Sequence, residues 1–131
     1  PSRIIFAGRS GCGKGVSSKN LALSASPPFQ RIVVLHIDKE TLEFEDLDAE
    51  MIDSLPDFDK FATFWDRDQK SLLIVDEANF EGMARAERGK IDRMVQYVAS
   101  HYGVSIYILQ QNFCSIPVSI RRAADWWVLY P

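Results

Sequence analysis

The sequence predicts a single α/β domain in which helices sandwich a five-stranded, mostly parallel sheet. Five short apolar runs occur along the chain, and each is nearly continuous rather than alternating, which is typical of strands buried on both faces. Stretches with helical spacing separate several of these runs, and strands that alternate with helices indicate a parallel sheet. The chain has 131 residues, so we expect residues 1–131 to form one domain.

The five apolar runs give the bounds of the predicted strands, and the stretches between them give the predicted helices. The strands span residues 3–8, 31–38, 71–77, 105–111 and 125–130. The helices span residues 14–25, 57–66 and 89–102. Residues 39–56 are acidic, and we expect them to form a solvated connection with at most a short helix. A cation site in that stretch is an alternative that nothing in its sequence supports.

The composition is that of a globular protein whose surface is not specialised for nucleic acid. Hydrophobic residues make up 47% of the chain and charged residues 25%. The formal net charge is −3, so any contact with DNA would have to be local. No run of apolar residues is long enough for a membrane-spanning helix, and we predict no membrane contact.

The stretch GRSGCGKG, residues 8–15, predicts a phosphate-binding loop because it follows an apolar strand and precedes a helix. Its glycines allow a sharp turn that points backbone N–H groups at phosphate oxygens, and the helix N-terminus adds a partial positive charge. Lys14 would reach the β- and γ-phosphates of ATP. The expected nucleotide contacts are Gly8, Arg9, Ser10, Gly11, Cys12, Gly13, Lys14, Gly15 and Val16.

Gly15 departs from the phosphate-loop pattern, which has Ser or Thr after the lysine. That hydroxyl normally binds Mg²⁺, so a water molecule or a neighbouring group must take its coordination position here. Ser18 lies one helical turn further on, too far along the axis to replace it directly. We expect nucleotide binding to survive, with the metal held less directly. Nucleotide kinases also have GKG in this loop, so a nucleotide kinase is an alternative. In those kinases a Thr follows, where this chain has Val16, and the similarity is limited to the loop.

A second motif, SLLIVDE in residues 71–77, ends an apolar strand with two carboxylates. Asp76 would hold Mg²⁺ through water, and Glu77 would polarise the water that attacks ATP. A strand that runs into a polar turn is common by itself, but beside a phosphate loop the pair favours an ATP hydrolase. The pair also argues against a kinase, because a kinase must avoid activating water.

A third motif is the apolar strand that ends in Gln110 and Gln111, followed by Asn112, a loop with Ile-Pro, an arginine pair and a last strand. An amide at the tip of a strand beside the phosphate loop can sense the γ-phosphate or orient water. This order of motifs resembles the FtsK–HerA superfamily of DNA-pumping ATPases, and most closely the poxvirus-type viral genome-packaging ATPases. The resemblance implies a RecA-like P-loop NTPase. We expect the strand at residues 105–111, the Gln strand, to lie between the strand at residues 3–8, which leads into the phosphate loop, and the strand at residues 71–77, which ends in Asp76 and Glu77.

The resemblance implies a role for each motif residue, with ATP and Mg²⁺ as the cofactors. Lys14 binds the phosphates, Asp76 holds the metal, Glu77 is the catalytic carboxylate and Gln111 is the sensor. Members of the superfamily work as rings with the nucleotide at the subunit interface, where an arginine of the adjacent subunit completes the site.

Two arginine pairs are candidates for that role in a neighbouring subunit. Arg85 and Arg88, which follow the catalytic carboxylates, are preferred over Arg121 and Arg122. The stretch from residue 85 to residue 93 is also the most basic part of the chain. It is either a pore loop that grips DNA phosphates or the polar face of a helix.

The function predicted in this way is an ATP-hydrolysing motor that translocates double-stranded DNA and packages a viral genome. Its expected partners are double-stranded DNA, further copies in a pentameric or hexameric homo-oligomeric ring, and capsid or portal vertex components. Its expected location is the host cell cytoplasm or the virion. Two alternatives stay open, namely a nucleotide kinase and a structural ring component that binds nucleotide with little or no turnover.

Overall fold

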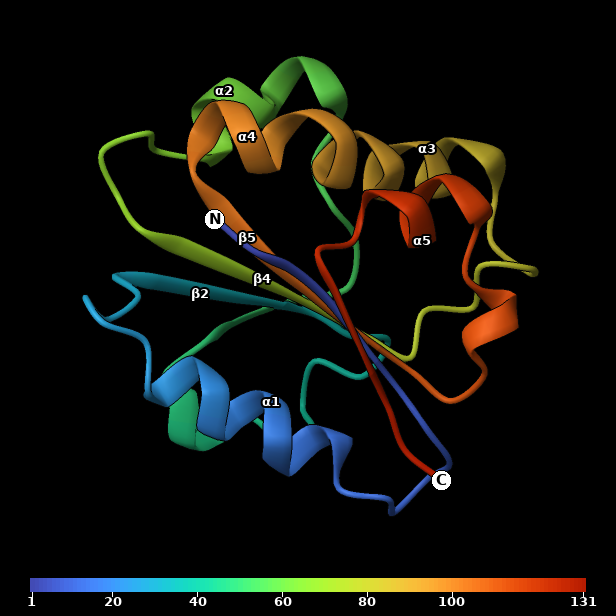
Figure 1. Ribbon diagram of the computed structural model, residues 1–131. Helices are drawn as coiled ribbons and strands as arrows, with labels where there is room; N and C mark the ends of the chain where they lie inside the picture. The colour runs from blue at the N-terminus through green and yellow to red at the C-terminus, as the bar shows by residue number, and fades with distance from the viewer.

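A computed structural model describes residues 1–131 and contains one six-stranded sheet between two layers of helices (Figure 1). The strand order is β3-β2-β4-β5-β1-β6, and every neighbouring pair is parallel. The predicted α/β class is confirmed, and the Gln strand β5 lies between β4 and β1 as expected. The strands are β1 (Arg3–Ala7), β2 (Arg31–Leu35), β3 (Glu50–Ile52), β4 (Ser71–Asp76), β5 (Val104–Gln110) and β6 (Trp126–Leu129).

The sheet has one strand more than predicted, because the acidic stretch 39–56 contains β3. This strand pairs in parallel with β2, with Val33 beside Glu50. It has three residues, begins with a glutamate and lies at the edge of the sheet, so no apolar run reveals it. The short helix expected in the same stretch is a 3₁₀ turn at Glu45–Leu47.

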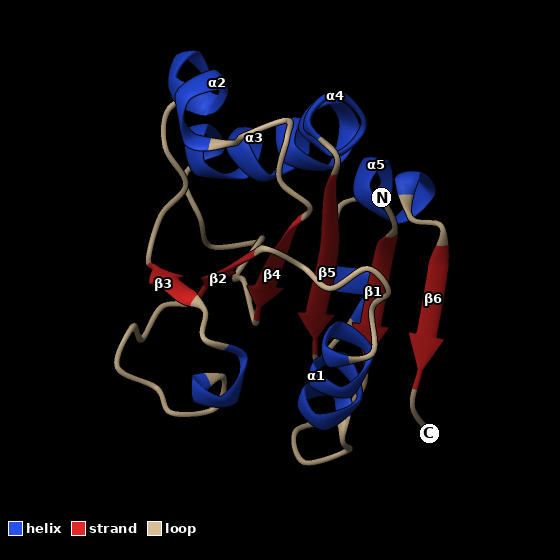
Figure 2. Ribbon diagram, turned by 90° about the vertical axis from the view of Figure 1, so that its left-hand side faces the viewer, coloured by secondary structure: helices blue, strands red, loops and turns tan.

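Helices cover both faces of the sheet, and they are divided unequally between the faces. The helix α1 (Lys14–Leu23) lies on one face, and the remaining α-helices lie on the other (Figures 1 and 2). A π-helical segment, Met94–Val98, joins α3 to α4 in one continuous run. The helices of the second face are α2 (Phe61–Phe64), α3 (Arg85–Arg93), α4 (Ala99–Tyr102) and α5 (Val118–Ala123).

The predicted helices differ from the structure in three places. The helix expected at 89–102 begins at Arg85, because Gly89 is accommodated inside α3. The stretch 57–66 forms only a 3₁₀ turn and the short α2. The loop expected around the second arginine pair contains α5. No helix has both the length and the apolar character that are needed to cross a bilayer.

Alternate residues of the central strands contribute to two separate apolar cores. Leu73 and Val75 of β4 join a cluster of 19 buried residues that includes Met94 of the helical layer above the sheet. Leu72 and Ile74 belong to a second cluster of 10 buried residues on the face of α1. Every residue of β4 is buried, which explains why its sequence is continuous rather than alternating.

The carboxyl ends of all six strands meet at one edge of the sheet because the strands are parallel. At this edge β1 leads into the phosphate loop, β2 into His36, β4 into Glu77 and β5 into Gln111. Open α/β sheets bind their ligands at this edge. The three sequence motifs are therefore brought together where a ligand site is expected.

Candidate nucleotide and metal site

The phosphate loop turns sharply into α1 at Gly13. This residue has a φ of 99°, a left-handed conformation that glycine adopts without steric cost. The helix begins at Lys14, and its first turn contains no acidic residue. The unpaired N–H groups and the positive end of the helix dipole are therefore free to act on an anion.

Lys14 and Glu77 form an ion pair across the mouth of the loop. The Nζ of Lys14 lies 3.1 Å from Oε1 of Glu77, and the lysine is buried while the glutamate side chain is 43% exposed. Glu77 follows β4 with a φ of 52°, and its N–H donates to the carbonyl of Leu109. This turn takes Glu77 out of the line of the strand, so that its carboxylate meets the lysine of the phosphate loop.

Asp76 is the buried carboxylate of the site, with only 6% of its surface exposed. Its pKa is raised from the usual range to about 6, chiefly by burial and then by the nearby carboxylate of Glu43. Glu77 acts in the same direction, whereas His36 and Lys14 lower the pKa. A cation beside Asp76 would favour its charged form.

His36 presents a proton to this cluster rather than a lone pair. Its Nδ1 accepts a hydrogen bond from the backbone N–H of Asp38 at 2.8 Å. The neutral ring therefore carries its proton on Nε2, the atom that lies 3.2 Å from Oδ2 of Asp76. In this tautomer, His36 stabilises the charged Asp76 carboxylate and is not itself available to bind a metal.

Glu43 occupies the space beside Gly15. A Cβ atom added to Gly15 would lie 2.5 Å from Oε1 of Glu43. The ligand atoms of His36, Glu43 and Asp76 all lie within 4.8 Å of one another. Mg²⁺ prefers carboxylate oxygens and keeps several water ligands, so the pair formed by the exposed Glu43 and the buried Asp76 fits the ion that the fold class implies.

The motif residues surround a cavity of about 360 Å³. Its wall combines a phosphate loop with one ammonium group and three carboxylates. This is the chemistry of a site for a phosphate group and a divalent cation. The lining residues are Ser10, Gly11, Gly13, Lys14, Gly15, Val16, His36, Glu43, Asp76, Glu77 and Leu109.

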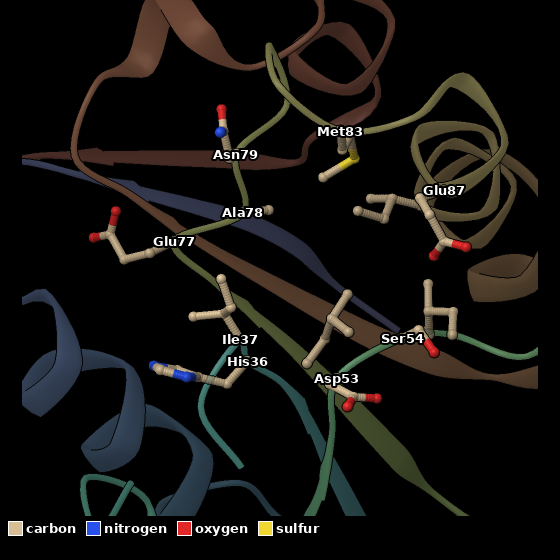
Figure 3. A pocket seen from close by; sticks show the side chains of 12 residues that line it. His36, Ile37, Asp53, Ser54, Glu77, Ala78, Asn79, Met83 and Glu87 are labelled. Carbon is tan, nitrogen blue, oxygen red and sulfur yellow. The ribbon is translucent and has the colours of Figure 1, made fainter. Parts of the chain in front are cut away.

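A larger cavity of about 590 Å³ lies on the other side of Glu77. Figure 3 shows it between Asp53 and Ser54 on one side and Met83 and Glu87 on the other, with the Glu77 carboxylate turned away from the last two. Half of its 12 lining residues are hydrophobic, and none belongs to the phosphate loop. The smaller cavity is therefore the better candidate for chemistry on a phosphate.

The two glutamines at the end of β5 have different environments. Gln111, the expected sensor, is exposed and does not line the cavity of the phosphate loop. Gln110 is buried, and its Nε2 donates a hydrogen bond of 2.6 Å to the carbonyl of Ala78, the residue that follows Glu77. Its Oε1 is buried without a partner. The structure thus connects Gln110, rather than Gln111, to the segment that carries Glu77.

The preferred arginines lie apart from the phosphate loop of their own chain. Arg85 and Arg88 are exposed on α3 and line a separate cavity between α3 and α5. Their basic neighbours are engaged elsewhere: Lys90 pairs with Glu87, and Arg93 stacks on an aromatic ring. The basic stretch, residues 85–93, is interpreted from its sequence as either a pore loop or the polar face of a helix. In the structure these residues form the helix α3.

Two residues of the site, His36 and Glu43, were missed by sequence reasoning. His36 had a signal, because it is a polar residue directly after an apolar strand whose carboxyl end reaches the site edge. Glu43 had none, because it is one of several acidic residues in the stretch 39–56. Its position depends on how that stretch packs against α1.

No protein-family model matches the sequence, and no curated protein sequence matches it either. Solved structures do match. B204, the DNA-packaging ATPase of Sulfolobus turreted icosahedral virus, has a TM-score of 0.68 and 16% identity over 98% of this chain and 74% of that chain. The fold is that of the RecA-like P-loop ATPases.

Two further matches have the same fold. The cytoplasmic domain of EssC matches with a TM-score of 0.71 and 14% identity over 98% of this chain and 31% of that chain. RuvB from Thermotoga maritima matches with a TM-score of 0.60 and 11% identity over 98% of this chain and 37% of that chain. The fold is therefore shared with proteins that are much longer than this chain.

Proposed function

We propose that this protein is an ATP-hydrolysing motor that moves double-stranded DNA and packages a viral genome into a capsid. The observation that carries the proposal is the convergence of Lys14, Asp76 and Glu77 at one cavity, from two strands with β5 between them. This places a phosphate-binding lysine beside two carboxylates at the ligand edge of the sheet. The fold shared with a viral DNA-packaging ATPase supports the choice of DNA as the polymer that is moved.

In the proposed reaction, Lys14 and the N–H groups of the loop bind the β- and γ-phosphates of ATP. The Nζ of Lys14 exchanges its contact with Glu77 for phosphate oxygens, which frees the Glu77 carboxylate to accept a proton from water. The water oxygen bonds to the γ-phosphorus, and the bond from that phosphorus to the bridging oxygen breaks. The products are ADP and inorganic phosphate.

Bound Mg²⁺ would neutralise part of the phosphate charge in this reaction. The residues that would hold it are Asp76, which is buried beside His36, and Glu43, which lies against Gly15. Gln111 remains the proposed sensor, and its exposure at the end of β5 suits a residue that passes the state of the γ-phosphate to another subunit or to DNA.

The proposed motor is a pentameric or hexameric homo-oligomeric ring that docks on capsid or portal vertex components in the host cytoplasm or the virion. Arg85 and Arg88 lie outside the cavity of their own chain, so they would act on the site of an adjacent subunit. Such an arginine raises the rate of hydrolysis by roughly 10³–10⁵-fold in related reactions.

The rival with an observation in its favour is a ring component that binds nucleotide without turnover. Gly15 lacks the hydroxyl that holds the metal in working phosphate loops, and the lysine is already paired with the carboxylate that should activate water. This rival predicts nucleotide binding with no phosphate release under any condition.

The test measures phosphate release from ATP and Mg²⁺, with and without linear duplex DNA, over a range of protein concentrations. We expect turnover that duplex DNA increases and that Glu77→Gln abolishes. Glu81→Gln is the matched control, because Glu81 is exposed and does not line the phosphate-loop cavity. ATP binding without turnover, at all concentrations and with DNA present, would contradict the motor and favour the structural ring component.

A further inference from the structure

The space that a Ser or Thr would occupy after the phosphate-loop lysine is filled by a carboxylate from another part of the chain. Residue 15 has no side chain, and Oε1 of Glu43 approaches to 2.5 Å of the point where its Cβ would be. A glycine is therefore required here for Glu43 to keep its place. Conversely, the carboxylate brings an oxygen within 2.5 Å of the Cβ that would have carried the missing hydroxyl.

Glu43 is held at this position by its own segment. The next residue, Phe44, is 1% exposed, and Leu47 is also buried in the core on the α1 face. Lys19 of α1 donates from Nζ to the backbone carbonyl of Glu43 at 2.8 Å. The acidic stretch is thus anchored at the Glu43 backbone and on its C-terminal side, and this places the Glu43 side chain beside the phosphate loop.

The charge of the cavity requires a cation when a nucleotide binds. Lys14 supplies one positive charge, against the three carboxylates of Glu43, Asp76 and Glu77. A triphosphate adds further negative charge, so the carboxylates would repel the nucleotide unless an ion lay between them. Without a bound cation, the Glu43 carboxylate would therefore weaken nucleotide binding.

We propose that Glu43 replaces the hydroxyl missing at Gly15, and that Glu43 and Asp76 together hold the divalent cation of the nucleotide site. The ligand atoms are carboxylate oxygens, and His36 offers a proton rather than a lone pair, so the site suits Mg²⁺ or Mn²⁺ better than zinc. The proposal rests on the nucleotide site of the proposed function, but it concerns metal binding and can be tested without turnover.

The experiment titrates the protein with Mn²⁺, alone and with the slowly hydrolysed analogue ATPγS. Free Mn²⁺ is followed by electron paramagnetic resonance, because the signal of the free ion decreases when the ion binds. We expect Glu43→Ala to weaken Mn²⁺ binding by at least about 10–100-fold, the loss that follows removal of even an outer-shell partner. The matched control is Glu45→Ala, which removes the same charge from an exposed residue outside the cavity and should leave binding unchanged.

A double substitution tests the exchange directly. Gly15→Ser restores the hydroxyl, and its Cβ needs the space that Glu43 now occupies. We expect the Gly15→Ser, Glu43→Ala protein to recover most of the Mn²⁺ affinity that Glu43→Ala alone loses. Such recovery cannot come from a general effect of charge on metal binding or from a defect in folding.

The outcomes separate this proposal from the proposed function. Mn²⁺ affinity that is equal in the wild type and in Glu43→Ala, with ATPγS still bound, would overturn the role of Glu43 and leave the ATPase intact. ATPγS binding in saturating Mn²⁺ that is tighter in Glu43→Ala than in the wild type would show that Glu43 blocks the site rather than holding the ion, and would also overturn it. Binding of Mn²⁺ that depends on Glu43 without any binding of ATPγS would support the metal site and contradict the proposed function.

Discussion

At the scale of single residues, the backbone of Glu77 is the clearest sign of a site under constraint. It is one of two non-glycine residues with positive φ, at 52°. This conformation costs an ordinary side chain about 1–2 kcal/mol. The cost falls on a residue that ends β4 and turns its carboxylate towards Lys14. Strain of this kind accumulates at functional sites, where the surrounding structure enforces it.

We predict that Glu77→Asn raises the free energy of unfolding by about 0.5–1 kcal/mol and abolishes phosphate release. Asparagine tolerates the left-handed conformation better than glutamate. The ion pair with Lys14 is partly exposed and contributes less than about 1 kcal/mol, and its loss is offset by weaker repulsion of Asp76. Urea denaturation measures the stability, and a phosphate assay measures the turnover.

The control for this prediction is Glu81→Asn. Glu81 is exposed and does not have a positive φ, so its substitution should change neither stability nor turnover. A lower free energy of unfolding in Glu77→Asn would contradict the prediction. It would show that the contacts of the Glu77 carboxylate stabilise the fold by more than the positive φ of its backbone destabilises it.

At the scale of elements, the strands and their edge were predictable, whereas the partner of Gly15 was not. Parallel strands buried on both faces give continuous apolar runs, and their carboxyl ends necessarily share one edge, so Lys14, Asp76 and Glu77 could be placed together. β3 escaped prediction because three residues at a sheet edge leave no pattern. Glu43 escaped because its place depends on the packing of Phe44 and Leu47, which no local pattern encodes.

The start of α1 allows a second prediction, based on two glycines with equal room but different backbones. Apart from the adjoining residues and the backbone of its own helix, nothing lies within 4 Å of a Cβ built on Gly13 or on Gly89. Gly13 has a φ of 99°, so Gly13→Ala should lower the free energy of unfolding by about 1–2 kcal/mol and weaken ATPγS binding. Gly89 lies within α3, so Gly89→Ala should raise the free energy of unfolding by about 0.5–1 kcal/mol.

Both variants are compared with the wild type by urea denaturation and by nucleotide titration. Opposite signs of the two stability changes are the expected result, since the two substitutions add the same methyl group to open space. Equal signs would mean that the loop relaxes around alanine, and that the left-handed turn is not what positions the N-terminus of α1.

At the scale of the whole molecule, the proposed function requires a second chain to complete the site. Arg85 and Arg88 are exposed on α3 and line the cavity between α3 and α5, whereas the phosphate loop has a cavity of its own. Turnover that depends on protein concentration would follow from this arrangement.

The mixing of two inactive variants tests this arrangement. A protein with Arg85→Ala and Arg88→Ala keeps Glu77 but has no arginine to offer, and Glu77→Gln keeps both arginines but has no catalytic carboxylate. We predict that neither protein alone releases phosphate, and that a mixture regains part of the wild-type rate. The recovery arises at interfaces where a subunit with intact Glu77 meets a subunit with intact arginines.

Arg122→Ala in place of the double arginine variant is the control, because Arg122 is exposed and lines neither cavity. An inactive mixture in which both variants remain assembled would mean that Arg85 and Arg88 act within their own chain or have no role in turnover. Loss of turnover in Arg122→Ala alone would mean that the pair Arg121 and Arg122, and not Arg85 and Arg88, serves the neighbouring site.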